Sequence, residues 1–177
     1  MHLMETGQNA KDTNVILIGM CGVGKSTVGV ILAKMMSRYF LDSDVFVQAI
    51  QDRDLQQIID TEGLEAFCKI EEEYVTCIDV KNAVIATGGS VVYSPRAMQH
   101  LADIGIIIHL DLDFDTIRQR VTDLYARGVV MEKGQTLKSL YEKRHRLYQE
   151  YAQLTIDCAN KTHEQIAEEI TSRLSMQ

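Results

Sequence analysis

The chain has 177 residues, of which 18 are basic and 25 acidic, giving a formal net charge of −7. Its hydrophobic fraction of 46% is ordinary for one globular domain and argues against a disordered or collagen-like chain. The acidic balance disfavours a nucleic-acid partner, which needs clustered positive charge. No apolar run approaches the roughly 20 residues that a membrane span requires, so we expect no membrane partner.

The N-terminal residues and the cysteines give two further expectations. We expect residues 1–13 to form a flexible polar tail, because they lack the apolar core of a signal peptide. The four cysteines form no CxxC pair, so we expect neither a disulfide framework nor a zinc site, and a cytoplasmic location. The five histidines make no HExxH-type pattern.

Short apolar runs alternate with segments of helical periodicity from residue 14 onward. The runs predict buried strands at residues 14–18, 39–42, 83–87, 105–110 and 155–158. The periodic segments predict helices at residues 25–38, 137–152 and 163–174, and a longer helical segment at residues 45–81 that is broken near residues 51–54 and at Gly63. Two further helices are predicted: one begins at Pro95, and the other begins after a cap at Asp113 and runs to about residue 124. The order predicts a mostly parallel sheet of five strands with helices on both faces, in which ligands bind beyond the carboxyl ends of the strands.

The segment from Gly19 to Ser26 matches the phosphate-binding pattern GxxxxGK[ST], between a predicted strand and a predicted helix. Such a loop turns backbone N–H groups and a helix N-terminus towards phosphate oxygens. We expect Lys25 to reach the β- and γ-phosphates and Ser26 to ligate Mg²⁺. The predicted fold is therefore a three-layer P-loop NTPase fold like that of nucleoside monophosphate kinases, with a nucleotide site made by Gly22, Val23, Gly24, Lys25, Ser26 and Thr27.

Acidic residues follow two of the predicted strands. Asp42 and Asp44 leave the second strand two residues apart, as a metal-orienting acid and a proton acceptor for phosphoryl transfer to an alcohol could. The alternative is that these residues only cap the next helix. Asp111 ends an apolar strand in the manner of a second P-loop signature, but we favour a plain strand-end residue there, because the Asp42 and Asp44 pair fits better.

From about residue 14 to the C-terminus the sequence resembles the shikimate kinase family. The matching elements are Phe40-Leu41-Asp42-Ser43-Asp44, Phe67 with Glu71, Ile85-Ala86-Thr87-Gly88-Gly89, Arg120 with Arg127, and Arg144-His145-Arg146-Leu147-Tyr148. The resemblance implies a kinase that uses ATP and Mg²⁺ to phosphorylate a small hydroxylated acid, with shikimate as the first choice. We expect the kinase to be a monomer. The resemblance also implies one domain over residues 14–177, with acceptor-binding helices at residues 43–80 and a lid at residues 125–136.

The resemblance further implies a role for each matched residue. Asp44 would bind the acceptor hydroxyls and act as the base, and Asp42 would orient Mg²⁺. The remaining roles would be N–H donation to the acceptor by Gly88 and Gly89, a grip on the acceptor carboxylate by Arg144, contact with adenine by Arg120, and contact with the phosphates by Arg127 of the lid.

The acceptor half of the pattern departs from the family, most importantly at Cys68. Cys68, which we place in the acceptor-binding set, stands where the family carries a second carboxylate-binding arginine, and a cysteine cannot make a bidentate charged pair. Lys69 is a poor substitute, because neighbouring helical residues point about 100° apart. The alternatives are weaker shikimate binding, a replacement cation such as Arg146 or Arg53, a gluconate-kinase-like carbohydrate kinase, or a nucleotide-binding regulatory module without turnover.

Overall fold

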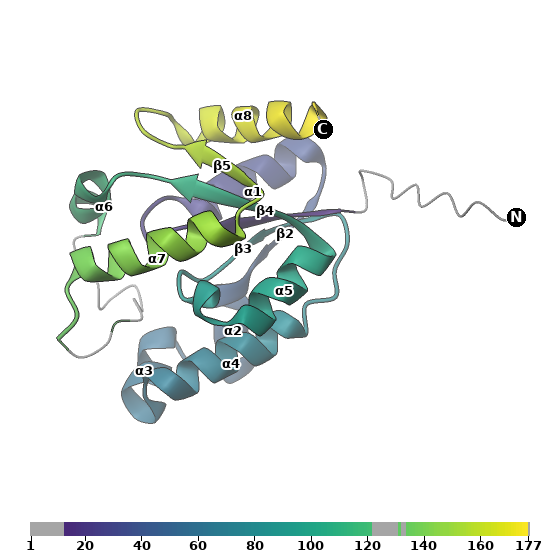
Figure 1. Ribbon diagram of the computed structural model, residues 1–177. Helices are drawn as coiled ribbons and strands as arrows, with labels where there is room; N and C mark the ends of the chain where they lie inside the picture. The colour runs from purple at the N-terminus through teal and green to yellow at the C-terminus, as the bar shows by residue number, and fades with distance from the viewer. Residues whose placement is uncertain (1–12, 122–130, 132–133, 177) are drawn as a thin grey trace, which may run out of the picture.

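The computed structural model describes residues 13–121, 131 and 134–176 (Figure 1). Its sheet has five strands in the order β2-β3-β1-β4-β5, and every neighbouring pair is parallel. The strands are β1 (Asn14–Ile18), β2 (Tyr39–Asp42), β3 (Ala83–Ala86), β4 (Gly105–Asp111) and β5 (Leu154–Asp157). All five predicted strands are confirmed, within one residue at each end.

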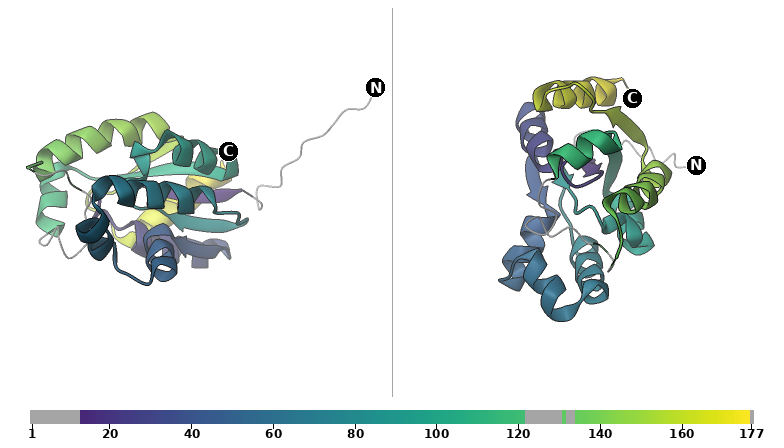
Figure 2. Two further views of the ribbon diagram at one scale, coloured as in Figure 1. Left: turned by 90° about the horizontal axis from the view of Figure 1, so that it is seen from below. Right: turned by 90° about the vertical axis from the view of Figure 1, so that its left-hand side faces the viewer.

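Helices cover both faces of this sheet. They are α1 (Lys25–Met36), α2 (Ser43–Gln51), α3 (Leu55–Glu62), α4 (Leu64–Thr76), the 3₁₀ turn η1 (Val91–Tyr93), α5 (Pro95–Ile104), α6 (Phe114–Arg120), α7 (Leu137–Tyr151) and α8 (His163–Ser175). Helices α1 and α8 pack together on one face, and α5 and α7 pack against β4 on the other (Figure 2). The predicted three-layer α/β fold is therefore confirmed.

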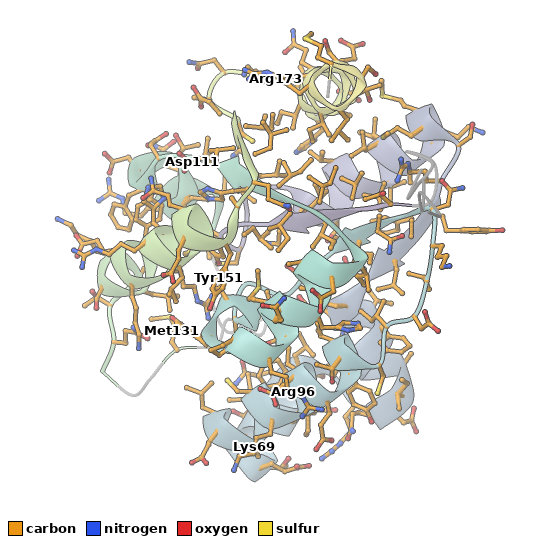
Figure 3. All side chains as sticks on the ribbon, turned by 45° about the vertical axis from the view of Figure 1, so that its right-hand side comes forward. Lys69, Arg96, Asp111, Met131, Tyr151 and Arg173 are labelled. Carbon is orange, nitrogen blue, oxygen red and sulfur yellow. The ribbon has the colours of Figure 1, made fainter. Side chains whose placement is uncertain are left out.

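Side chains fill the space between the layers (Figure 3). The main core lies around β1, β3 and β4, whose inner residues are almost completely buried. A second, smaller core lies under α2, α3 and α4 and consists of Val47, Leu55, Ile58 and Phe67. No helix among the described residues is both long and apolar enough to cross a membrane.

Local capping explains where the predicted helices begin and end. The long helical segment divides where Asp54 forms a capping box with Gln57, and again at Gly63, whose φ of 86° suits glycine. The first helix ends at Met36, two residues early, because Ser37 takes a left-handed conformation with φ 54°. The helix expected to run to about residue 124 ends at Arg120, because Val121 leaves the helical region.

The strand register brings three segments of the predicted active site to the carboxyl end of the sheet. Leu17 of β1 lies beside Ala86 of β3, and Ala86 lies beside Asp42 of β2. The phosphate loop, the acid pair and the glycines after β3 therefore all leave the sheet at the same end.

Candidate active site

A cavity of about 1180 Å³ lies beyond the carboxyl ends of the strands. Its wall combines the phosphate loop, the acid pair, the segment after β3 and two helix-borne arginines. The polar and charged lining residues include Lys25, Ser26, Thr27, Asp42, Asp44, Gln48, Thr87, Ser90, Arg120, Arg144 and His163. Residues from both predicted halves of the site, nucleotide and acceptor, thus face one space.

The phosphate loop begins α1 with its glycines in conformations that other residues rarely adopt. Gly22 has φ 80° and Gly24, the N-cap of α1, has φ 107°. Lys25 folds back over the loop and donates from Nζ to the carbonyls of Gly19 (2.7 Å) and Met20 (3.0 Å). Burial lowers the pKa of Lys25, while the charges of Asp44 and Asp42 oppose this shift.

Ser26 and Asp42, the two predicted Mg²⁺ residues, are in direct contact. The Ser26 hydroxyl donates to Asp42 Oδ2 at 2.6 Å, and both side chains line the cavity. The other carboxylate oxygen of Asp42 accepts the backbone N–H groups of Asp44 and Val45 and so caps α2. A hydroxyl and a carboxylate are hard oxygen ligands of the kind that Mg²⁺ prefers, so this pair fits the ion that the phosphate loop implies.

Asp44 lies in the first turn of α2 and lines the cavity, where the charges of Asp42, Lys25 and Arg144 act on it. Burial raises the pKa of Asp44 to about 6, and the charge of Asp42 adds to the shift, while Lys25 and Arg144 oppose it. Such a carboxylate is ionised at pH 7 and is more basic than an exposed aspartate. It therefore has the properties of a general base for an alcohol.

The two glycines after β3 serve different purposes. A Cβ on Gly88 would lie 2.6 Å from Asp44 Oδ1 and would also strike Glu71, so glycine lets both carboxylates approach the chain. The Gly88 N–H donates to the buried Ser43 hydroxyl at 3.0 Å and so has a partner within the protein. Gly89 lines the cavity, whereas Gly88 does not, so a part in acceptor binding stays a prediction that the geometry favours for Gly89.

Arg144 reaches the cavity from α7 although it is only 1% exposed. Its Nε donates to the Tyr93 hydroxyl at 3.2 Å, and its guanidinium lies over the Tyr93 ring at 5.2 Å. A Cβ on Gly89 would lie 2.9 Å from Arg144 Nη1. The guanidinium is thus held beside Gly89, in the segment after β3 that contains Gly88 and Gly89 (the glycine loop). A binding group for an anionic acceptor needs such a fixed position.

The position of the missing family arginine is not part of the cavity lining. Cys68 is half-buried in α4 against the smaller core and is absent from the cavity lining, in contrast to its neighbour Phe67. Glu71, one turn along α4, is buried, and no described residue hydrogen-bonds its Oε1. Burial raises the pKa of Glu71 to about 7, with a further contribution from Asp44, while a hydrogen bond with Ser90 opposes the shift.

None of the candidate replacement cations faces the cavity. Arg53 pairs with Glu62 at 2.6 Å, and Arg146 lines a separate small cavity on α7. Lys69 projects from the outer surface of α4 and pairs with Glu65 at 2.9 Å (Figure 3). Within the described part of the chain, Arg144 is therefore the arginine positioned near the glycine loop.

The two predicted nucleotide-contacting arginines have different outcomes. Arg120, at the end of α6, lines the cavity and donates from Nη1 to the Val23 carbonyl at 3.4 Å, so it lies beside the phosphate loop. Val23 itself is fully buried and supports the loop from inside. Arg127 lies outside the described residues, as does most of the predicted lid, and its role stays a prediction.

The structure also adds residues that the sequence analysis missed. Tyr148 is buried on α7 and donates to the Gly89 carbonyl at 2.7 Å, one turn after Arg144. The four-residue spacing from Arg144 could have shown that both share a helix face. Tyr93 lies in an unpredicted 3₁₀ turn, and His163 reaches Gly24 from α8, so no local sequence signal pointed to either.

A phosphate loop, an acid pair and a buried arginine around one cavity at the edge of a parallel sheet define a P-loop kinase of small molecules. Comparison with known proteins makes the class specific. The sequence model of the family described as shikimate kinase matches residues 21–175, and the chain belongs to that family. The phosphoryl donor of shikimate kinases is ATP with Mg²⁺.

Relatives and solved structures agree with this family. The chain is 34% identical to a shikimate kinase of Staphylococcus haemolyticus over 168 residues, covering 94% of this chain and 97% of the relative. It is also 34% identical to a shikimate kinase of Lactococcus lactis over 161 residues, covering 90% and 97%. A structure of Acinetobacter baumannii shikimate kinase in complex with shikimate superposes with TM-score 0.86 at 28% identity, covering 94% of this chain and 95% of that one.

A more distant likeness shows the fold alone. A gluconokinase structure from Sinorhizobium meliloti superposes with TM-score 0.51 at 15% identity, covering 94% of this chain and 93% of that one. The gluconate-kinase-like alternative thus shares the architecture with this chain but gains no further support from the comparison.

Proposed function

We propose that this chain transfers the γ-phosphoryl group of ATP to a hydroxyl group of shikimate and releases ADP. The observation that carries the proposal is the contact between Ser26 and Asp42 beside Asp44, within the cavity that also holds Lys25 and Arg144. Membership of the shikimate kinase family, and the relative solved in complex with shikimate, support this acceptor.

In the proposed reaction Asp44 takes the proton of the acceptor hydroxyl. Its pKa of about 6 keeps it ionised at pH 7, yet leaves it basic enough to accept that proton. The hydroxyl oxygen forms a bond to the γ-phosphorus as the bond to the β–γ bridging oxygen breaks, and that electron pair leaves with ADP. The proton remains on the Asp44 carboxylate until ADP and the phosphorylated acceptor depart.

The other side chains hold the reactants and offset the negative charge. Lys25 and the N–H groups of the phosphate loop bind the β- and γ-phosphates. Ser26 would hold Mg²⁺ directly and Asp42 would orient it, and the bound ion would neutralise charge on the phosphates. Arg144 would bind the acceptor carboxylate through its paired N–H groups, and Arg120 would lie beside the adenine.

The proposal assigns the acceptor and the nucleotide to different segments of the chain. Helices α2 to α4, within residues 43–80, would hold the acceptor, and the segment 125–136 would close over the nucleotide with Arg127. All four cysteines are free thiols, which supports a reducing, cytoplasmic location.

The decisive experiment measures ADP release with shikimate, with gluconate and with no acceptor. We expect shikimate to stimulate ADP release well above the no-acceptor rate, and Lys25→Met to abolish the stimulation while the circular dichroism spectrum stays that of the wild type. Faster turnover with gluconate would contradict the proposed acceptor. Tight ATP binding without stimulation by either acid would indicate a regulatory module.

A further inference from the structure

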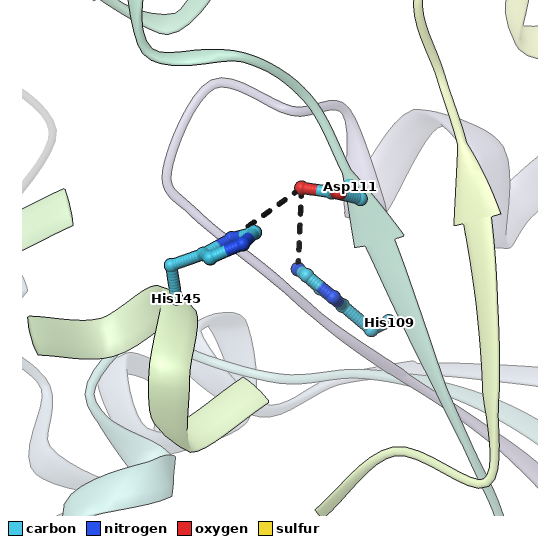
Figure 4. Close-up of side chains that lie close together, drawn as sticks. All are labelled: His109, Asp111 and His145. Atoms are coloured by element: carbon cyan, nitrogen blue, oxygen red, sulfur yellow. Dashed lines mark ion pairs between the residues drawn. The ribbon is translucent and has the colours of Figure 1, made fainter. Parts of the chain in front are cut away.

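Two histidines and one aspartate form a cluster outside the cavity, where β4 ends beside α7 (Figure 4). His109 and Asp111 come from β4, and His145 comes from α7. Each residue offers one metal-ligating atom, and the three atoms lie within 4.8 Å of one another. None of the three lines the cavity, so the cluster is separate from the proposed Mg²⁺ position at Ser26.

The separations within the cluster are wider than hydrogen bonds, and the shortest of them matches the spacing of two ligand atoms around a shared ion. Asp111 Oδ1 lies 3.5 Å from His145 Nδ1 and 3.9 Å from His109 Nε2. A direct N–H···O bond spans about 2.7–3.2 Å. Ligand atoms around a tetrahedral zinc ion, with bonds of about 2.0–2.2 Å, lie roughly 3.3–3.6 Å apart. Small side-chain rotations would therefore close the three groups onto one ion.

His109 is buried and faces Asp111 through Nε2. Its side chain is 2% exposed. The Tyr148 ring stacks against the imidazole with the centroids 5.1 Å apart, which fixes the ring and excludes water from that face.

The other two ligands combine access with orientation. The side chains of His145 and Asp111 are 25% and 34% exposed, which leaves an entry path from solvent. Tyr141 stacks on His145 with the centroids 5.3 Å apart, and its hydroxyl donates to the Leu112 carbonyl at 3.1 Å. This contact holds the His145 ring facing the end of β4.

The donor set selects the kind of cation. Two imidazole nitrogens and one carboxylate suit Zn²⁺ and similar transition metals, whereas Mg²⁺ and Ca²⁺ prefer oxygen ligands alone. The positive charge of Lys25 acts on His109 and disfavours a cation there, and the negative charge of Asp111 acts in the opposite sense. Three protein ligands leave the fourth tetrahedral position for water.

We propose that His109, Asp111 and His145 bind a divalent transition-metal ion of the zinc type, which joins α7 to the end of β4. The sequence predicts no zinc site, because its cysteines are not paired and its histidines lack HExxH spacing. Here the ligands are 36 residues apart at the extremes, from His109 to His145, and meet only because α7 packs on β4. The fold, rather than a local motif, assembles this donor set.

The test is a calorimetric titration of the metal-free full chain with Zn²⁺ in the presence of excess Mg²⁺. We expect one Zn²⁺ per chain for the wild type, and at least about tenfold weaker binding for both His145→Ala and Asp111→Asn. The control is His100→Ala, since His100 lies on α5 and its Nε2 contacts the Ile78 carbonyl. We expect this variant to bind Zn²⁺ as the wild type does.

Substitution by Co²⁺ distinguishes this cluster from cysteine thiolates. We expect the visible absorption of tetrahedral Co²⁺ without a thiolate charge-transfer band, and its loss in Asp111→Asn. The proposal is overturned if the wild type binds no stoichiometric Zn²⁺, if both variants bind it unchanged, or if a thiolate band accompanies binding. Circular dichroism establishes that each variant is folded, and Asp111→Asn, the smaller change, decides if His145→Ala does not fold.

Discussion

The hydroxyl of Ser26 donates a 2.6 Å hydrogen bond to Asp42, and this contact joins the first turn of α1 to the end of β2. Asp42 uses its other oxygen to cap α2, so the helix-capping and metal-orienting interpretations of this aspartate are compatible. The Asp42 carboxylate, which caps the first acceptor-side helix, is thereby held against Ser26 of the phosphate-binding segment. A substitution at Asp42 that removes only the charge should therefore weaken Mg²⁺ binding and leave the capping of α2 intact.

The first prediction concerns Asp42→Asn. Asparagine caps a helix about as well as aspartate, so we expect the free energy of unfolding to change by less than about 1 kcal/mol. The loss of charge should weaken Mg²⁺ and lower kcat by roughly 10- to 100-fold, with partial recovery at high Mg²⁺. ADP release measured against Mg²⁺ concentration checks this. Asp113→Asn, which changes the cap of α6, is the control and should keep wild-type activity.

The second prediction follows from the pKa of Asp44, which is about 6. A general base must be ionised, so kcat/KM should rise with pH through about 6 and level off above it. Asp44→Asn should lower kcat by about 10²- to 10⁴-fold and remove this pH dependence, while ATP affinity measured by calorimetry stays within a factor of about three. A selective loss of ATP binding would instead place Asp44 in the nucleotide site.

The third prediction concerns the buried carboxyl of Glu71. Its pKa is raised from 4.5 to about 7, so the folded protein holds the proton more tightly than the unfolded chain does. The resulting stabilisation is full below about pH 4.5 and is lost as the pH rises through about 7. At about 1.4 kcal/mol per pKa unit, the ionised carboxylate costs on the order of 3 kcal/mol at pH 8.

Glu71→Gln should remove that cost. The free energy of unfolding is measured by urea titration at pH 5 and at pH 8. We expect the difference between the variant and the wild type to shift in favour of the variant from pH 5 to pH 8, by up to about 3 kcal/mol. Glu73→Gln, at an exposed position of the same helix, is the control and should keep the wild-type pH dependence. An equal effect of Glu71→Gln at both pH values would show that packing, not ionisation, is responsible.

The fourth prediction concerns Tyr148, whose hydroxyl donates to the Gly89 carbonyl at 2.7 Å. Tyr148→Phe removes this buried hydrogen bond, which contributes about 1 kcal/mol, so we expect the KM for the acceptor to rise roughly fivefold. The KM for ATP should not change, because the phosphate loop is untouched. Tyr151→Phe, at the half-buried end of α7, is the control. Equal increases in both KM values would refute a specific link to Gly89.

Much of the fold could be predicted from the sequence because its signals are local. Buried parallel strands appear as short apolar runs, and Pro95 and the Asp113 cap mark helix starts directly. The carboxyl-end rule for parallel sheets then correctly placed the phosphate loop beside Asp42 and Asp44. These predictions needed no knowledge of how distant helices pack.

The remaining features of the site depend on packing between elements far apart in the chain. The hydrogen bond from Gly88 to Ser43 pairs residues 45 apart, and the stacking of Tyr148 on His109 joins α7 to β4. The absence of Cys68 from the cavity lining likewise depends on how α4 packs against α2 and α3. Periodicity gives the buried face of a helix but not the neighbour that this face meets.

The last prediction tests why the acceptor side departs from the family pattern. Cys68 lies close enough to Glu71 and Arg144 for their charges to act on its thiol, and burial raises the pKa of that thiol. An arginine at this position would find Glu71 as a partner and would add a second cation near Arg144. A charge-assisted hydrogen bond contributes about 1.5–3 kcal/mol, so Cys68→Arg should lower the KM for shikimate roughly tenfold or more, without changing the KM for ATP.

Cys77→Arg, which adds the same charge at the exposed end of α4, is the control and should leave both KM values unchanged. Cys68→Arg should also change the behaviour of Glu71. Because the new guanidinium stabilises the ionised carboxylate, the loss of stability from pH 5 to pH 8 should be smaller in Cys68→Arg than in the wild type. A flatter stability profile without tighter shikimate binding would mean that the arginine pairs with Glu71 alone and that Arg144 suffices for the acceptor carboxylate.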